Sequence, residues 1–245
     1  MSNEIQVDML SFKFNDKMPK WHNIKNVTDW VKSFESSGKN EKGHSALSLA
    51  EFCSVENIEE EFKVILQPIF ASDGFNLHTA IPEKSSRFDN YGKQRIHDLA
   101  IYGQTDTGKT IFVGIEAKVN ETYNSNLSSI YDKAKRDQLN GKSAMIPQRI
   151  EGLIENYFPT LSMGLSVRYQ LLYAIAGTLC EQSNYNILLF LTFKTSKYKE
   201  SAAQRNKKDL MDVLDSVKHE VIADGYYKCI FGDKILYIVE KTVTL

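Results

Sequence analysis

The sequence predicts a layered α/β domain built around a β-hairpin near the middle of the chain. Three observations carry this prediction. Residues 96–102 and 110–119 are rich in apolar, β-branched and aromatic side chains, and a polar turn containing glycine separates them. The segments on either side repeat apolar residues at helical spacing. The nearly continuous apolar run 186–194 is typical of a strand buried on both faces. Helices that precede, flank and follow strands favour a layered α/β domain.

Composition indicates an ordinary globular chain of 245 residues with a formal net charge of −1. Affinity for nucleic acid would therefore depend on a local basic surface. Cys53, Cys180 and Cys229 lie too far apart for a zinc motif, and their odd number argues against a disulfide framework. The first ten residues lack a signal-peptide pattern and no apolar run is long enough to cross a bilayer. We therefore expect a cytoplasmic protein with reduced thiols and no membrane partner.

The first half of the chain is expected to hold an N-terminal extension and the start of the core domain. Residues 1–40 are predicted to pack as an extension on the domain 41–245. Asn26 or Thr28 is expected to cap a short helix that ends near Phe34. Further elements are predicted in this order: a helix at 45–53, a helix at 56–66 ended by Pro68, a strand at 75–81, and a surface loop at 82–94.

The second half is expected to be mainly helical up to its last strands. Predicted helices cover 127–139, 148–158 and 165–182, and the buried strand 186–194 follows them. An amphipathic helix is predicted at 202–221. A closing hairpin is predicted from strands 226–231 and 235–239, which turn at Gly232 and Asp233.

The central hairpin carries the candidate site. Side chains alternate across a strand, so Glu116 and Lys118 share one face of the second strand. If the hairpin closes symmetrically about Asp106, Asp98 lies opposite Gly114 on that same face. Asp98 is then one diagonal step, about 7–8 Å, from Glu116. The sequence thus predicts two carboxylates and an amine that converge on one point.

This combination suits metal-assisted cleavage of a phosphodiester. Asp98 and Glu116 offer the hard oxygen ligands that Mg²⁺ prefers, and a bound metal neutralises charge that develops on the phosphate. Lys118, beside two anions, is assigned to orienting the nucleophile and stabilising charge. The alternative is that these residues form ordinary surface ion pairs. Glu116 and Lys118 end a strongly apolar strand, where unpaired charge needs an explanation.

Asp98 followed by Glu116-Ala117-Lys118 resembles the motif of the PD-(D/E)XK nuclease superfamily, which has the restriction-endonuclease-like fold. The resemblance covers roughly residues 45–193, with His97 where a proline often precedes the aspartate. It implies a mixed β-sheet flanked by helices, with Asp98, Glu116 and Ala117 as metal ligands. It also implies a further catalytic glutamate from the helix before the sheet, a position that Glu51 occupies.

The segments 116–121 and 168–172 are also similar to those of a little-characterised bacterial family within this superfamily. The resemblance implies a Mg²⁺-dependent deoxyribonuclease, with Mn²⁺ as a substitute, that acts on DNA in bacterial restriction or phage defence. A homodimer and a partner subunit of a defence system both stay open. So does a catalytically inert nucleic-acid-binding or interaction module of the same fold.

Residues 103–110 fit the P-loop pattern G-x-x-x-x-G-K-[ST] letter for letter. A P-loop needs a helix to begin at its lysine, so that backbone amides point at phosphate. Here the β-type run 111–115 follows instead. We therefore interpret the segment as a hairpin turn, and nucleotide binding is kept as an alternative function.

Further candidates are contacts to nucleic acid. Arg168 and Gln170 open a predicted buried helix, where helix capping or a core hydrogen bond is an equal alternative. The stretch 194–208 is the most basic of the chain and offers Lys197, Lys199 and Arg205 to phosphates. A solvated loop and helix face is the alternative there.

Overall fold

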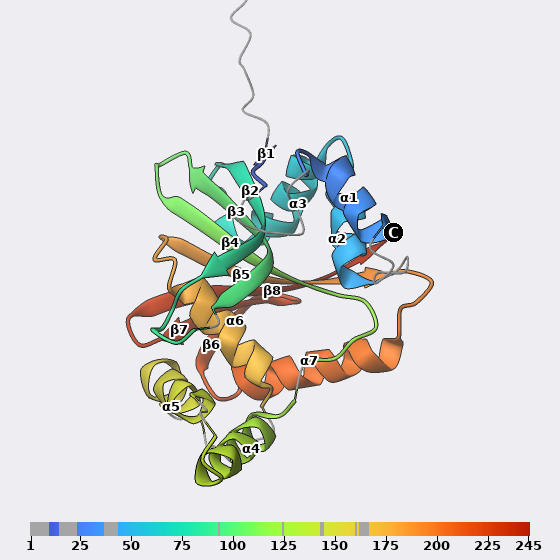
Figure 1. Cartoon of the computed structure of the whole chain (residues 1–245). Coiled ribbons are helices and arrows are strands. Elements are labelled where there is room, and N and C mark those ends of the chain that lie inside the picture. Colours follow the sequence, from blue (N-terminus) through green and yellow to red (C-terminus); the bar gives the residue numbers. More distant parts are fainter. Residues whose placement is uncertain are drawn as a thin grey trace, which may run out of the picture.

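The computed structural model describes residues 10–14, 24–36, 44–92, 94–123, 125–142, 145–159, 161 and 167–245. Within these residues, eight strands form one mixed sheet in the order β1-β2-β3-β4-β5-β8-β7-β6. Helices pack on both faces of the sheet (Figure 1). The predicted α/β class is therefore confirmed.

The described elements of the first half are β1 (Ser11–Phe12), α1 (Val27–Ser36), α2 (Ser45–Phe52), α3 (Ile58–Phe70), β2 (Phe75–Ser86), β3 (Arg95–Thr105) and β4 (Thr110–Lys118). Those of the second half are α4 (Leu127–Leu139), α5 (Ile146–Tyr157), α6 (Tyr169–Leu179), β5 (Tyr185–Lys194), α7 (Glu200–Leu214), β6 (Lys218–Ala223), β7 (Tyr226–Phe231) and β8 (Lys234–Thr244). Within the described ranges, every helix is too short or too polar to span a membrane.

The sheet combines antiparallel and parallel pairing. Strands β2, β3 and β4 form an antiparallel meander. The chain then crosses over through α4, α5 and α6, so that β5 pairs parallel with β4, and β8 pairs parallel with β5. Because both faces of these central strands are covered, β4 after its exposed first residue, Thr110, and most of β5 are buried, as expected for parallel strands between helical layers.

Two apolar layers follow from strand alternation. On one side, Ile115 and Ala117 of β4 join the core with α1, α2 and α3. On the other side, Leu188 and Phe190 of β5 join the core with α4, α5, α6 and α7. Glu116 and Lys118, which alternate with Ile115 and Ala117, therefore belong to the α6 side of the sheet.

The described parts of the first 40 residues pack on this fold. Strand β1 pairs parallel with β2 through Ser11 and Phe12. Trp30 of α1 is 1% exposed and belongs to the first core. The observed helix contains the predicted segment up to Phe34, and the Asn26 side chain accepts a hydrogen bond from the Asp29 backbone (2.9 Å), as in a helix cap. The proposed boundary at residue 40 lies outside the described residues.

Two predicted boundaries before the hairpin are wrong. Helix α3 continues past Pro68 to Phe70, whose ring stacks on that of Phe75 with 4.2 Å between centroids, so packing stabilises the last turn. Strand β2 continues to Ser86 into the predicted loop. Pro82 is tolerated there because it lies beyond the short β1, where β2 is an edge strand.

The predicted helix at 202–221 is also wrong in its last part. Helix α7 ends at Leu214, and residues 218–223 form the edge strand β6, paired antiparallel with β7. Most of β6 is exposed. Its sequence therefore lacks the apolar alternation by which a half-buried strand is recognised.

The central hairpin forms, but its turn is centred one residue later than predicted. Thr105 N–H donates to the Lys109 carbonyl (2.9 Å), and Gly108 adopts φ +79° within this turn. The strands therefore pair Ala100, rather than Asp98, with Gly114. Continuing that register places Asp98 directly across from Glu116. A shift of two residues keeps each side chain on its predicted face.

Gly114 allows β4 to pass close under the ring of His97, which is fully buried and lies edge-on to Phe112. A Cβ at residue 114 would lie 2.6 Å from His97 Nδ1. We expect Gly114→Ala to lower the free energy of unfolding by about 1–3 kcal/mol in chemical denaturation, because the core around the ring is overpacked.

Gly152→Ala is the matched control for that substitution. Gly152 lies in α5, and a Cβ there would approach no described atom more closely than 4.0 Å. It should stabilise the protein by about 0.5–1 kcal/mol, since glycine weakens a helix interior. Equal effects of the two substitutions would contradict the packing at Gly114.

Candidate functional site

Glu116 is the centre of a buried group of charged and polar side chains. It is 2% exposed, and its Oε1 accepts a hydrogen bond from Lys118 Nζ at 2.7 Å. Its Oε2 pairs with Arg95 Nη2, and Gln170 Nε2 of α6 also donates to Oε1. We call Asp98, Glu116, Lys118, Arg95 and Gln170 the Glu116 cluster.

Asp98 joins this cluster where the β3–β4 ladder ends. The last backbone pair is Leu99 with Ile115. Beyond it, the Ala117 N–H donates to Asp98 Oδ2 at 2.8 Å. The carboxylate of Asp98 thus takes the place of a backbone acceptor, and this fixes it beside Glu116.

The strand alternation of β3 is also interrupted at Asp98. Leu99 belongs to the core on the α2 side, whereas His97, two residues earlier, packs on Gly114 and Phe112. Residues two apart in a regular strand would share a face. This local irregularity turns the start of β3 toward α6 and brings Arg95 under the helix.

The two carboxylates of the cluster have opposite electrostatic environments. Burial and the neighbouring Glu116 charge raise the pKa of Asp98 well above its ordinary value. Burial would also raise the pKa of Glu116, but the positive charges of Arg95 and Lys118 outweigh it and lower that pKa. Asp98 is therefore the carboxylate that lacks enough positive charge, and a cation beside it would relieve the repulsion.

This donor set fits a hard divalent cation. Asp98 and Glu116 provide carboxylate oxygens on adjacent strands, the type of ligand that Mg²⁺ binds. Within the described residues, no group of three or more His, Cys, Asp or Glu side chains gathers to hold a metal. Any metal at this site would thus depend on these two carboxylates, with backbone or solvent oxygens completing its coordination.

Sequence reasoning missed Arg95 as a member of the cluster. It is 6% exposed, and its side chain passes against Gly177 of α6, where a Cβ would lie 2.5 Å from Arg95 Cγ. A charged residue just before an apolar strand looks like the end of a loop. Only Gly177, far along the chain in the predicted apolar helix 165–182, gave a signal that a side chain must pass close by.

Two predicted residues lie away from the cluster. Glu51 is in α2, which packs on the opposite layer, and no contact among the described residues links its side chain to Asp98 or Glu116. Arg168 is buried and forms an ion pair with Asp209 (2.9 Å), which ties the start of α6 to α7. The charge of Arg168 is used in this ion pair. Gln170, the other predicted contact at the start of the helix, instead donates a hydrogen bond to Glu116.

The predicted basic contacts lie around the start of α7. Lys199 and Arg205 are exposed, and Lys197 is half-buried. Their role in binding nucleic acid stays a prediction. Tyr123 lines a cavity together with Tyr198 and Glu200 near the start of α7, and its ring is 5.6 Å from Lys118 Nζ.

The segment that matches the P-loop pattern is a strand end, a turn and a strand start. Strand β3 runs to Thr105 and β4 begins at Thr110. No helix starts at Lys109, so the amides that a P-loop directs at phosphate are absent from this described segment. The hairpin interpretation of the sequence is confirmed.

These features define an α/β protein with a mixed sheet and a buried cluster of carboxylates and cations at the end of its central hairpin. Residues 23–239 match the family described as Domain of unknown function (DUF6946), and the chain therefore belongs to that family. No curated protein and no solved structure matches the chain significantly.

Proposed function

We propose that this protein is a metal-dependent nuclease that hydrolyses phosphodiester bonds in DNA. The observation that carries the proposal is the convergence of Asp98, Glu116 and Lys118 at the end of the β3–β4 hairpin. The raised pKa of Asp98 adds to it, because a site with uncompensated negative charge beside Glu116 favours a cation.

The order of elements supports a restriction-endonuclease-like core. Helices α2 and α3 precede an antiparallel meander, helices follow, and β5 then returns parallel to β4. This succession of helices, a hairpin, further helices and a later strand falls within residues 45–193, which the resemblance covers. A role in bacterial restriction or phage defence is supported by the resemblance alone.

In the proposed reaction, Asp98 and Glu116 hold the divalent cation, and Lys118 acts on the attacking water and the phosphate. A bound cation supplies Lewis-acid stabilisation of the charge that develops on the phosphate oxygens. The Lys118 ammonium, held by Glu116 at 2.7 Å, can orient the water and share that charge. Gln170 and Arg95 fix the Glu116 carboxylate from the α6 side.

A second candidate is an inert nucleic-acid-binding or interaction module of the same fold. One observation favours it: both oxygens of Glu116 already accept hydrogen bonds or ion pairs from Lys118, Gln170 and Arg95. A cation at Glu116 must share a carboxylate oxygen with one of these donors or displace it. Whether the protein cleaves DNA in the presence of a divalent metal therefore decides between the nuclease and the inert module.

The test is a cleavage assay on supercoiled plasmid and on single-stranded DNA with Mg²⁺, Mn²⁺ or EDTA. We expect nicking or degradation with either metal and none with EDTA. DNA binding without cleavage, across both substrates and both metals, would favour the inert module.

A further inference from the structure

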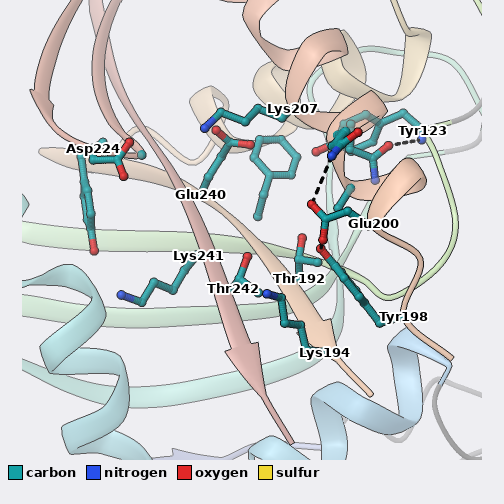
Figure 2. A pocket seen from close by; sticks show the side chains of 16 residues that line it. Tyr123, Thr192, Lys194, Tyr198, Glu200, Lys207, Asp224, Glu240, Lys241 and Thr242 are labelled. Atoms are coloured by element: carbon teal, nitrogen blue, oxygen red, sulfur yellow. Dashed lines mark hydrogen bonds between the residues drawn. The ribbon is translucent and has the colours of Figure 1, made fainter. Parts of the chain in front are cut away.

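A polar cavity lies beside the Glu116 cluster on the α6 side of the sheet. Its volume is about 400 Å³, and it opens between α7, the turn before β7, and the carboxyl-terminal ends of β5 and β8. We call it the Tyr198 pocket. The residues that matter for its chemistry are Tyr123, Lys194, Tyr198, Lys207 and Glu240 (Figure 2).

The strand register makes this pocket an extension of the cluster. Glu116 of β4 pairs with Phe190 of β5, and Phe190 pairs with Glu240 of β8. These three residues lie side by side on neighbouring strands, so their side chains are on the same face of the sheet. Glu116 and Glu240 are therefore two strand spacings, or about 10 Å, apart. Two residues further along the same strands, Lys118 of β4 pairs with Thr192 of β5.

Tyr123 separates the Glu116 cluster from the Tyr198 pocket. Its ring meets Phe190 edge-on, with 5.5 Å between centroids, and lies under Lys118 Nζ. Burial first, and then the charges of Glu116 and Glu240, raise its pKa well above the ordinary value, which agrees with a position between the two carboxylates. The backbone of Tyr123 is held by Asn206 of α7, whose Oδ1 accepts from its N–H at 3.0 Å.

The pocket combines lysines and aromatic rings with one enclosed acid, Glu240, and two exposed acids, Glu200 and Asp224. Lys194 and Lys207 are exposed, and Lys194 Nζ lies 5.5 Å from the centre of the Tyr198 ring. Figure 2 shows the Lys207 side chain extending to Glu240, whose carboxyl lies on the floor. Burial raises the pKa of Glu240, and Lys207 partly offsets this.

We propose that the Tyr198 pocket binds one nucleotide of the DNA strand, next to the phosphate that is cut at the Glu116 cluster. This inference rests on the proposed nuclease function. The exposed lysines contact the backbone phosphates, the base stacks on Tyr198, and Glu240 accepts a hydrogen bond from an exocyclic amino group, as carboxylates do from cytosine.

The carboxyl group of Glu240 favours a nucleotide over a simple anion as the ligand of this pocket. A pocket for free phosphate would be disfavoured by a carboxylate on its floor. A base, by contrast, presents both an aromatic face and hydrogen-bond donors. The pocket therefore favours strands that carry cytosine or adenine over strands that carry only thymine, which has no exocyclic amino group.

Binding is measured with short fluorescein-labelled oligodeoxycytidine and oligothymidine in EDTA, where no cleavage can occur. We expect Tyr198→Ala to weaken oligodeoxycytidine binding about fivefold or more, because stacking on one base is lost. Lys207→Ala should also weaken it and lower its salt dependence by about one phosphate contact. Glu240→Gln should bring the affinities for the two oligonucleotides closer together.

Lys208→Ala is the matched control on the same helix. Lys208 follows Lys207 in α7 but pairs with Asp212 at 2.8 Å on the exposed surface. We expect it to bind both oligonucleotides like the wild type. Lys194→Ala is a second pocket variant at an exposed position beside Tyr198, where a failure to fold is not expected.

The outcomes separate the pocket from the nuclease proposal. If the wild type cuts DNA with metal but the Tyr198 and Lys194 variants bind like the Lys208 control, the pocket assignment is overturned and the nuclease stands. If binding depends on Tyr198 but no metal supports cleavage, the pocket is supported and the nuclease proposal is overturned. Competition by inorganic phosphate that equals competition by deoxycytidine monophosphate would overturn the nucleotide assignment.

Discussion

Glu116→Gln is expected to lower the rate of metal-dependent DNA cleavage by about a thousandfold or more. Glutamine keeps the size of the side chain and can still accept a hydrogen bond from Lys118. It removes the negative charge that would hold a cation and that pairs with Arg95. Time courses of plasmid nicking measure the effect, and thermal melting checks that the variant is folded.

Lys109→Ala is the control for that result. Lys109 lies in the β3–β4 turn, away from the cluster, so cleavage should stay within about twofold of the wild type. Any binding of ATP by the wild type should not depend on Lys109. Unchanged cleavage in the Glu116 variant would point to another site or to a contaminating nuclease. ATP affinity that Lys109→Ala removes would favour the P-loop alternative.

Arg168→Ala is expected to lower the free energy of unfolding by about 3–5 kcal/mol. The Arg168 and Asp209 side chains are only 11% and 8% exposed, and the guanidinium lies 2.9 Å from the carboxylate. Removing the arginine leaves a buried carboxylate without its partner and loosens α6 from α7. Urea denaturation followed by circular dichroism gives the change in stability.

An exposed ion pair on the same helix provides the comparison. Lys208 and Asp212 lie 2.8 Å apart with a largely exposed lysine side chain, so Lys208→Ala should cost less than about 0.5 kcal/mol. If Arg168→Ala costs no more than this control, the pair with Asp209 does not stabilise the protein as the buried geometry implies.

The face shared by the candidate catalytic residues could be predicted because side chains an even number of residues apart on a regular strand lie on the same face. Glu116 and Lys118 are two residues apart on one strand, and their contact follows at once. The predicted pairing of Asp98 with Gly114 was wrong by two residues. An even error leaves the side chain on the correct face, so the carboxylates still converge.

The rest of the site depends on contacts between elements that are distant in sequence. Arg95 and Gln170 enter the Glu116 cluster because α6 packs across β3 and β4, which no local pattern reveals. Glu51 has the expected place in the chain, but its helix packs on the other layer. Strand β6 could not be recognised since its pairing with β7 uses backbone groups and leaves its side chains exposed.

The register also explains why the Tyr198 pocket was missed. The sheet side of the pocket comes from β5 and β8. Strand β5 is placed beside β4, and β8 beside β5, only through two crossovers. Lys194 and Tyr198 belong to the basic stretch that the sequence singled out for phosphate contacts. Glu240 and Lys241 belong to the closing hairpin, which carried no functional signal.

The most direct test of the central claim is a pair of measurements on Lys118→Ala: DNA binding without metal and DNA cleavage with Mg²⁺. The substitution removes the ammonium that Glu116 holds at 2.7 Å but leaves both carboxylates in place. We predict binding close to that of the wild type, because phosphate contacts spread over a wider basic surface, together with loss of cleavage. Cleavage by Lys118→Ala at the wild-type rate would contradict an active site at the end of the β3–β4 hairpin.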